Sequence, residues 1–268
     1  MITDWDDAYD NSGLETDAPA IFADWGRRAA DFRTRADASL DIAYGPHARE
    51  RLDIFAPDGP PRGLIVFIHG GYWKAMGREG SSWIAEGPTR RGWAVAIPSY
   101  PLAPEARIAT IARSVAAALA VAAERVAGPV VLTGHSAGGH LAARLMCDDG
   151  LIPDGLAARV GRVVSISGVH DLRPLLRTRM NDVLRLTATE AAAESPALLR
   201  PREGLRLSAW VGADERPEFV RQAALLANIW TGLGARCTMT AAPGQRHFSI
   251  LDGLADPVSP ITAALVGG

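Results

Sequence analysis

Short runs of consecutive apolar residues, separated by segments of helical pattern, restrict the fold of this chain more than any other feature. The runs lie at residues 52–55, 63–68, 93–97, 130–133, 162–166 and 205–211, with a weaker one at 237–240. Continuous apolar strands of this kind are typical of a parallel sheet that is covered on both faces. Helical patterns lie between them at residues 106–126, 141–146 and 218–230. This alternation predicts an α/β fold with a mostly parallel central sheet flanked by helices.

Two segments fall outside the alternation. Residues 1–40 are polar and aromatic, with a helical pattern near residues 20–35, and residues 171–201 are interrupted by prolines. We interpret both as small cap-like elements at the mouth of the sheet; ordinary surface covering is the alternative. A chain of 268 residues can bury about three quarters of its unfolded surface in one core. We therefore expect one domain over residues 1–268.

Composition excludes several classes of protein. The formal net charge is −2, with 28 basic and 30 acidic side chains, and this balance argues against nucleic acid as a partner. No apolar stretch approaches the length of a membrane span. The acidic first ten residues do not resemble a signal peptide, and Cys147 and Cys237 cannot form a disulfide framework. We expect a cytoplasmic protein with no metal and no cofactor, because no ligand spacing occurs.

Ser136 stands at the centre of a G-x-S-x-G motif, GHSAG at residues 134–138. A β-branched run precedes the motif and a helical pattern follows it. In this context the motif forms a sharp strand-to-helix turn that exposes the serine hydroxyl, and tiny flanking residues prevent collisions. The positive end of the helix favours developing negative charge. We predict Ser136 as a nucleophile and the N–H of Ala137 as one oxyanion donor; a tight turn without catalysis is the alternative.

A second glycine-rich segment, HGGYW at residues 69–73, directly follows a buried run. Glycines at this place let backbone N–H groups point into a pocket. We expect Gly70 and Gly71 to donate to the oxyanion, with Gly71 as the main donor. Tyr72 and Trp73 would flank the acyl site and suit a flat aromatic substrate, unless they only pack beneath the cap elements. His69, at the end of a strand, is expected to be structural.

The general base should follow the nucleophile in the chain, because the order in this type of fold is Ser, then Asp or Glu, then His. His140 is four residues beyond Ser136 on the same helix and cannot turn back to the hydroxyl. His170 comes earlier than a base should. His247 lies in a loop after the last predicted strand, and we predict it as the base.

The acid that orients this base is expected at Asp214. It follows the apolar run at residues 205–211 and precedes a helical pattern, and such a loop lies at the carboxyl end of a strand. Its task is to hold the imidazole tautomer and to stabilise the imidazolium. Asp171 is the competing candidate. Glu215 and Glu218 are expected to be solvated or to be charges at a helix N-terminus.

Several motifs together resemble the kynurenine formamidase (arylformamidase) group of α/β-hydrolases, which is related to the hormone-sensitive-lipase-like esterases. The resemblance is carried by HGGYW, GHSAGGH, SGVHDL, Asn181-Asp182, Ser195-Pro196 and VGADERPEF. Residues 100–105, YPLAPE, are similar to the YRLAPE segment of these esterases, with Pro101 where Arg is usual.

The resemblance implies an α/β-hydrolase fold and hydrolysis of N-formylkynurenine to kynurenine and formate. It also implies the triad Ser136, Asp214 and His247, with an oxyanion hole at Gly70, Gly71 and Ala137. We therefore predict a serine hydrolase that cleaves an aryl formamide. A promiscuous short-chain carboxylesterase is the alternative, and a non-catalytic binding protein of the same fold is a remote one. The expected partner is a small-molecule substrate, with no nucleic acid or membrane; a homodimer stays open.

Overall fold

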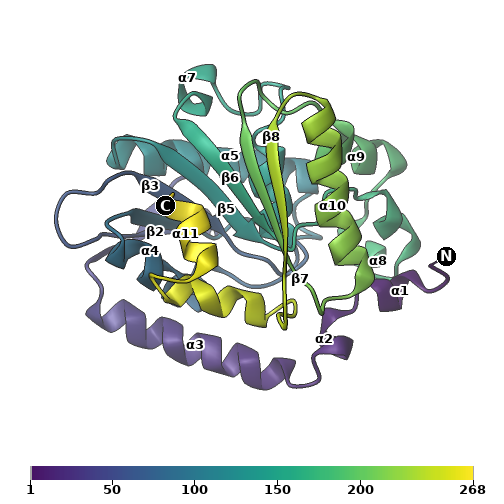
Figure 1. Ribbon diagram of the computed structural model, residues 1–268, viewed down its shortest axis with the longest axis horizontal. Coiled ribbons are helices and arrows are strands. Elements are labelled where there is room, and N and C mark those ends of the chain that lie inside the picture. Colours follow the sequence, from purple (N-terminus) through teal and green to yellow (C-terminus); the bar gives the residue numbers. More distant parts are fainter. Residues whose placement is uncertain (1, 268) are drawn as a thin grey trace.

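Residues 2–267, the part of the chain that this computed structural model describes, fold around an eight-stranded sheet (Figure 1). The strand order is β1-β2-β4-β3-β5-β6-β7-β8. Strands β1 and β2 pair antiparallel, as do β2 and β4, while every pair from β4 through β8 is parallel. The bounds are β1 Ala38–Ala43, β2 Arg51–Phe55, β3 Leu64–Ile68, β4 Ala94–Pro98, β5 Val130–His135, β6 Val160–Ile166, β7 Arg206–Gly212 and β8 Arg236–Ala242. The expected mostly parallel sheet is confirmed.

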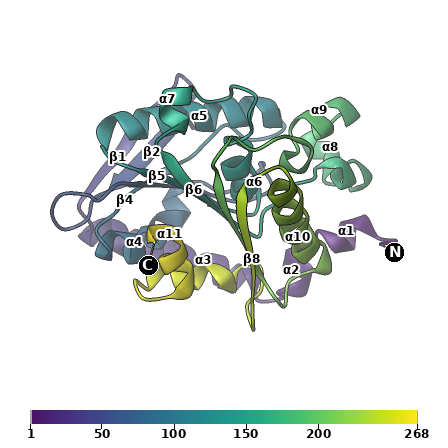
Figure 2. The same cartoon turned by 45° about the horizontal axis from the view of Figure 1, so that its top comes forward.

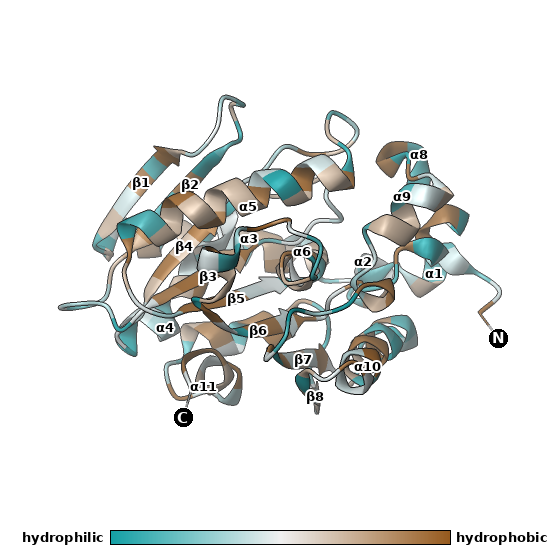
Figure 3. Cartoon of the chain, turned by 90° about the horizontal axis from the view of Figure 1, so that it is seen from above, coloured by the Kyte–Doolittle hydropathy of each residue, from teal (hydrophilic) through white to brown (hydrophobic). Residues whose placement is uncertain are grey.

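Helices cover both faces of this sheet, and Figure 3 shows α5 and α11 on opposite sides of it. The bounds are α1 Trp5–Ala8, α2 Asn11–Leu14, α3 Ala18–Arg35, α4 Glu86–Arg90, α5 Ile108–Arg125, α6 Ala137–Arg144, α7 Asp154–Ala157, α8 Asn181–Leu184, α9 Ala188–Ala193, α10 Pro217–Gly232 and α11 Pro260–Val266. Short 3₁₀ helices lie at Arg78–Ala85, Arg173–Arg177, Pro196–Leu198 and Ser249–Ala255. None of the helices within residues 2–267 combines the length and apolarity that crossing a membrane requires.

Strand β3 shows why the central strands are continuous apolar runs. Successive side chains of a strand point to opposite faces. Leu64, Val66 and Ile68 therefore enter the core beneath α5, α6 and α10, while Ile65 and Phe67 enter the core beneath α3 and α11. Both faces of β3 are buried. A strand that alternated apolar and polar residues would therefore bury polar side chains on one of these faces.

The first 40 residues serve two different structural purposes. Helix α3 lies along one face of the molecule (Figure 1) and buries Trp25, Ala29 and Phe32 in the core of that face. The chain then forms β1, an edge strand whose side chains are mostly exposed. Helices α1 and α2 and the first part of α3 lie at the mouth of the sheet. There α1 contacts the 3₁₀ helix Arg173–Arg177 of the second cap-like segment, and Figure 2 shows α1 on the same side of the molecule as α8 and α9.

The register of the parallel strands brings four loops to one edge of the sheet. Ile68 of β3 pairs with Gly134 of β5, His135 of β5 with Ile166 of β6, and Ile166 with Trp210 of β7. The loops that leave the carboxyl ends of these strands therefore meet, which is where ligands bind in open α/β sheets.

Candidate active site

Ser136 occupies the turn between β5 and α6 in a strained backbone conformation, with φ 55° and ψ −118°. A positive φ is costly for a residue with a Cβ and persists only where the surroundings enforce it. Here the Ser136 N–H donates to the Ile166 carbonyl at 2.8 Å, and the Ser136 carbonyl accepts from the His140 N–H at 3.0 Å. In this conformation, which the two hydrogen bonds maintain, Ser136 lines a pocket.

Glycine is required on both sides of this turn, because neighbouring backbone atoms leave no room for a side chain. A Cβ at Gly134 would lie 2.4 Å from the carbonyl oxygen of Gly138, and one at Gly138 would lie 1.9 Å from that of Ile68. Both distances are far below van der Waals contact, so the turn can pack against β3 only when these positions lack side chains.

The Nδ1 atom of His247 lies within hydrogen-bonding distance of a buried carboxylate. The Oε2 atom of Glu215 lies 2.7 Å from His247 Nδ1, and the side chain of Glu215 is fully buried. The other carboxylate oxygen accepts hydrogen bonds from the Gly212 N–H and the Ser167 hydroxyl, both at 2.6 Å. A carboxylate held at both oxygens fixes the orientation of the imidazole and would stabilise its protonated form.

Asp214, the acid expected from the sequence, does not reach His247. Its side chain is exposed, and its N–H donates to the Gln245 carbonyl at 3.0 Å. In the turn after β7 the side chain of Asp214 points to solvent, and the side chain of the next residue, Glu215, points inward to His247. The expectation of Asp214 as the partner is therefore wrong, as is that of Glu215 as a solvated charge or a charge at a helix N-terminus. The adjacent acidic pair was the available signal, but spacing alone does not tell which side chain turns inward.

The other two carboxylates considered, those of Asp171 and Glu218, bind partners other than His247. Asp171 forms two hydrogen bonds of 2.9 Å with the Arg173 guanidinium; burial raises the pKa of Asp171, but the bonds to Arg173 outweigh it and the net shift is downward. Of the two expectations for Glu218, a charge at a helix N-terminus is confirmed, since it lies in the first turn of α10. It is not solvated, because its buried carboxylate accepts from the Tyr9 hydroxyl at 2.8 Å and from Arg221 at 2.7 Å.

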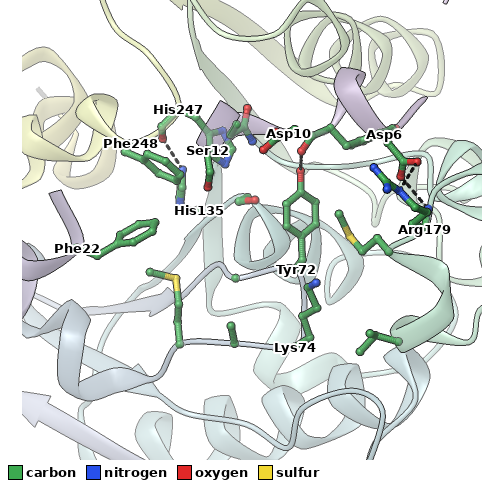
Figure 4. Close-up of a pocket in the computed structure, with 18 of the residues that line it drawn as sticks. Asp6, Asp10, Ser12, Phe22, Tyr72, Lys74, His135, Arg179, His247 and Phe248 are labelled. Carbon is green, nitrogen blue, oxygen red and sulfur yellow. Dashed lines mark hydrogen bonds and ion pairs between the residues drawn. The ribbon is translucent and has the colours of Figure 1, made fainter. Parts of the chain in front are cut away.

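Two further groups hold the loop that carries His247. His135 Nε2 lies 2.8 Å from the His247 carbonyl oxygen (Figure 4), and burial lowers the pKa of His135 well below its usual value. A neutral imidazole donates this hydrogen bond. From the other side, Glu15 accepts the Phe248 N–H at 3.0 Å, and burial raises the pKa of Glu15. No sequence motif pointed to Glu15, which lies 233 positions from Phe248.

The glycine-rich loop after β3 lies against the serine turn. A Cβ at Gly70 would come within 3.2 Å of Ser136 Cβ, and Gly71 has a φ of 98°, which favours glycine. Gly71 lines the same pocket as Ser136. With Ala137 at the first position of α6, the three residues expected to donate to an oxyanion surround Ser136.

The aromatic pair of this loop divides between the pocket and the core. Tyr72 lines the pocket, and its hydroxyl donates to the Tyr9 carbonyl at 2.5 Å. Trp73 is fully buried, and its Nε1 donates to His140 Nδ1 at 3.2 Å. The expectation that Trp73 contacts substrate is therefore wrong in this structure. His69 is structural as expected, stacked on the Tyr100 ring at 4.2 Å.

One pocket of about 950 Å³ contains Ser136 and His247 in its wall. Within residues 2–267 no hydrogen bond joins the two side chains, and His247 bonds instead to Glu215 and, through its carbonyl oxygen, to His135. Contacts between a nucleophile and its base are often loose without substrate and tighten in the complex. The remaining wall includes aromatic residues and much of α1 and α2: Asp4, Asp6, Asp7, Tyr9, Asp10, Asn11, Ser12, Phe22, Trp25, Gly71, Tyr72, Lys74, Ala75, Met76, His135, Arg179, Met180, Val183 and Phe248.

Residues 65–267 match the model of a family described as "Alpha/beta hydrolase family". The kynurenine formamidases of Salmo salar and Danio rerio are 29% and 27% identical to this chain; each alignment covers 87% of this chain and 83% of the relative. The crystal structure of a candidate thioesterase from Silicibacter sp. TM1040 has a TM-score of 0.94 at 41% identity, and covers 98% of this chain and 99% of that one. The expected fold and the resemblance to kynurenine formamidases are both confirmed.

Proposed function

The chain belongs to the alpha/beta hydrolase family, and on that premise we propose that it is a serine hydrolase that cleaves an aryl formamide. The substrate that we propose is N-formylkynurenine, with kynurenine and formate as products. The observation that carries this proposal is the pairing of His247 with the buried Glu215 beside Ser136 in one pocket. The similarity to kynurenine formamidases supports the choice of substrate.

In the proposed reaction the Ser136 hydroxyl attacks the formyl carbon while His247 takes its proton. The carboxylate of Glu215 stabilises the resulting imidazolium. Backbone N–H groups of the glycine-rich loop and of Ala137 receive the negative charge that develops on the carbonyl oxygen. His247 then protonates the departing aryl amine, and a formyl ester remains on Ser136. Water, deprotonated by His247, cleaves this ester to formate.

The walls of the pocket fit an aromatic leaving group. Phe22, Trp25 and Phe248 form a cluster with ring centroids 4.9 to 5.9 Å apart, and Tyr72 lines the pocket with them. Aromatic faces of this kind favour a flat aromatic substrate. The resemblance to kynurenine formamidases implies a small-molecule substrate of tryptophan catabolism. The composition adds the expectation that the protein works in the cytoplasm.

The test is a comparison of the natural protein with Ser136→Ala on N-formylkynurenine and on 4-nitrophenyl acetate. We expect the substitution to lower kcat for both substrates by roughly 10⁴-fold or more, as for other triad nucleophiles. Ser39→Ala is the matched control, because Ser39 is exposed on β1. Activity retained by Ser136→Ala would contradict the nucleophile.

Hydrolysis of esters or thioesters is the second candidate function, and the 41% identity to the candidate thioesterase favours it. The ratio of kcat/KM for N-formylkynurenine to that for 4-nitrophenyl acetate and for an aryl thioacetate separates the two functions. We expect the formamide to be the best substrate. A strong preference for the ester or thioester would assign the site to that chemistry instead.

A further inference from the structure

The wall of the pocket contains a buried amide whose hydrogen-bonding groups are unused. Asn11 is the first residue of α2, is 3% exposed and lines the pocket. Neither its Oδ1 nor its Nδ2 atom has a hydrogen-bond partner within residues 2–267. Buried polar side-chain atoms are nearly always paired. An unpaired amide at the wall of a substrate pocket therefore indicates that a ligand supplies its partners.

The segment that carries Asn11 is fixed on both sides. Tyr9 donates its hydroxyl to Glu218 at 2.8 Å and accepts the Tyr72 hydroxyl at its carbonyl oxygen at 2.5 Å. Glu15 accepts the Phe248 N–H at 3.0 Å. These contacts tie the segment to α10, to the glycine-rich loop and to the loop of His247, so the amide of Asn11 is held in place before substrate arrives.

The charged side chains of the pocket divide into paired and unpaired groups. Asp6 binds Arg179 at 3.0 Å, and Asp7 binds Arg216 at 2.8 Å, so these charges are compensated. Lys74, the only lysine of the chain, has neither an ion pair nor a side-chain hydrogen bond within residues 2–267. Figure 4 shows it beside Tyr72 in the pocket. It is the unpaired cation of the pocket wall.

Asp10 supplies the opposite charge. Its Oδ1 accepts the Gly13 N–H at 2.9 Å and so begins α2, and it forms no ion pair within residues 2–267. Asp4 also lines the pocket without an ion pair in the described part of the chain, but Asp10 is the carboxylate next to Asn11 in the sequence. The unpaired cation, this carboxylate and an amide whose donor and acceptor groups are both free thus share one pocket. This set matches a zwitterion, which offers a carboxylate to Lys74 and the Asn11 amide N–H, and an ammonium to Asp10 and the Asn11 amide oxygen.

We propose that Asn11, Lys74 and Asp10 form a subsite for a zwitterionic α-amino acid group on the leaving amine of the substrate. The proposal rests on the proposed function, in which that amine departs from Ser136. It assigns a role in substrate selection to the start of α2 and to the residue that follows the glycine-rich loop.

The test compares N-formylkynurenine with N-formylkynuramine, which keeps the formamide, the ring and the ammonium but lacks the carboxylate. We expect the natural protein to have the higher kcat/KM for N-formylkynurenine. Lys74→Met should lower the ratio of the two kcat/KM values by about tenfold through KM, as for the loss of one charge-assisted contact. Lys74→Arg should restore the ratio. Arg27→Met, which removes an exposed cation of α3, is the control.

Asn11→Leu separates a binding role of Asn11 from a structural one, because Tm and the ratio of kcat/KM values are measured on the same variant. Leucine is close in size and needs no hydrogen bonds, so the substitution should not lower Tm, yet it should lower the same ratio. If both formamides are hydrolysed and neither Lys74→Met nor Asn11→Leu changes the ratio, the subsite is wrong and the proposed function stands. If the natural protein hydrolyses 4-nitrophenyl acetate but neither formamide, the proposed function is wrong and the subsite falls with it.

Discussion

The carboxylate of Glu215 is held at both oxygens, whereas Asp214, one residue earlier, is exposed to solvent. Substitution of each by its amide separates their roles. In Glu215→Gln the amide would donate to His247 Nδ1 and force the tautomer that cannot accept a proton from Ser136. We expect kcat to fall by roughly 10³- to 10⁴-fold, with Asp214→Asn unchanged as the matched control. Steady-state kinetics check this, and the reverse pattern would restore Asp214 as the acid.

Glu15 gives a prediction about stability and pH. Burial raises its pKa above the ordinary value of 4.5, so the folded protein binds a proton more tightly than the unfolded chain. The contribution of Glu15 to stability therefore falls as pH rises from the unfolded pKa through the folded one. Glu15→Gln keeps an acceptor for the Phe248 N–H without this penalty. We expect the Tm of the variant, minus that of the natural protein, to increase from pH 4 upward; a difference independent of pH would contradict the raised pKa.

At the scale of elements, the close approach of β3, β5 and α6 decides whether the serine turn can form. A Cβ at Gly138 would collide with the Ile68 carbonyl, so Gly138→Ala should lower the free energy of unfolding by about 1–3 kcal/mol, the range for overpacking. Gly155→Ala in α7 is the matched control, because nothing lies within 4 Å of its Cβ position. There we expect a gain of about 0.5–1 kcal/mol from helix propensity. Urea denaturation measures both, and an equal effect would contradict the steric argument.

At the scale of the whole molecule, the sequence predicts what depends on repeating patterns and misses what depends on distant contacts. The strands from β2 to β7 were predicted because they are continuous apolar runs. Strand β1 was missed because its mostly exposed side chains form no such run. Ser136 and His247 follow from motif and chain order, whereas Glu215 depends on the direction of a side chain in an irregular turn. Glu15 belongs to the site only because the fold brings two remote segments together.

The central claim is that a formyl group passes from the substrate to Ser136. The most direct measurement is mass spectrometry of the protein quenched with acid during turnover of N-formylkynurenine, followed by digestion. We predict a peptide that contains Ser136 and is heavier by one formyl group, and its absence in Ser136→Ala. Rapid production of kynurenine with the formyl group on another residue, or with no acylated peptide at any quench time in the natural protein, would contradict the account.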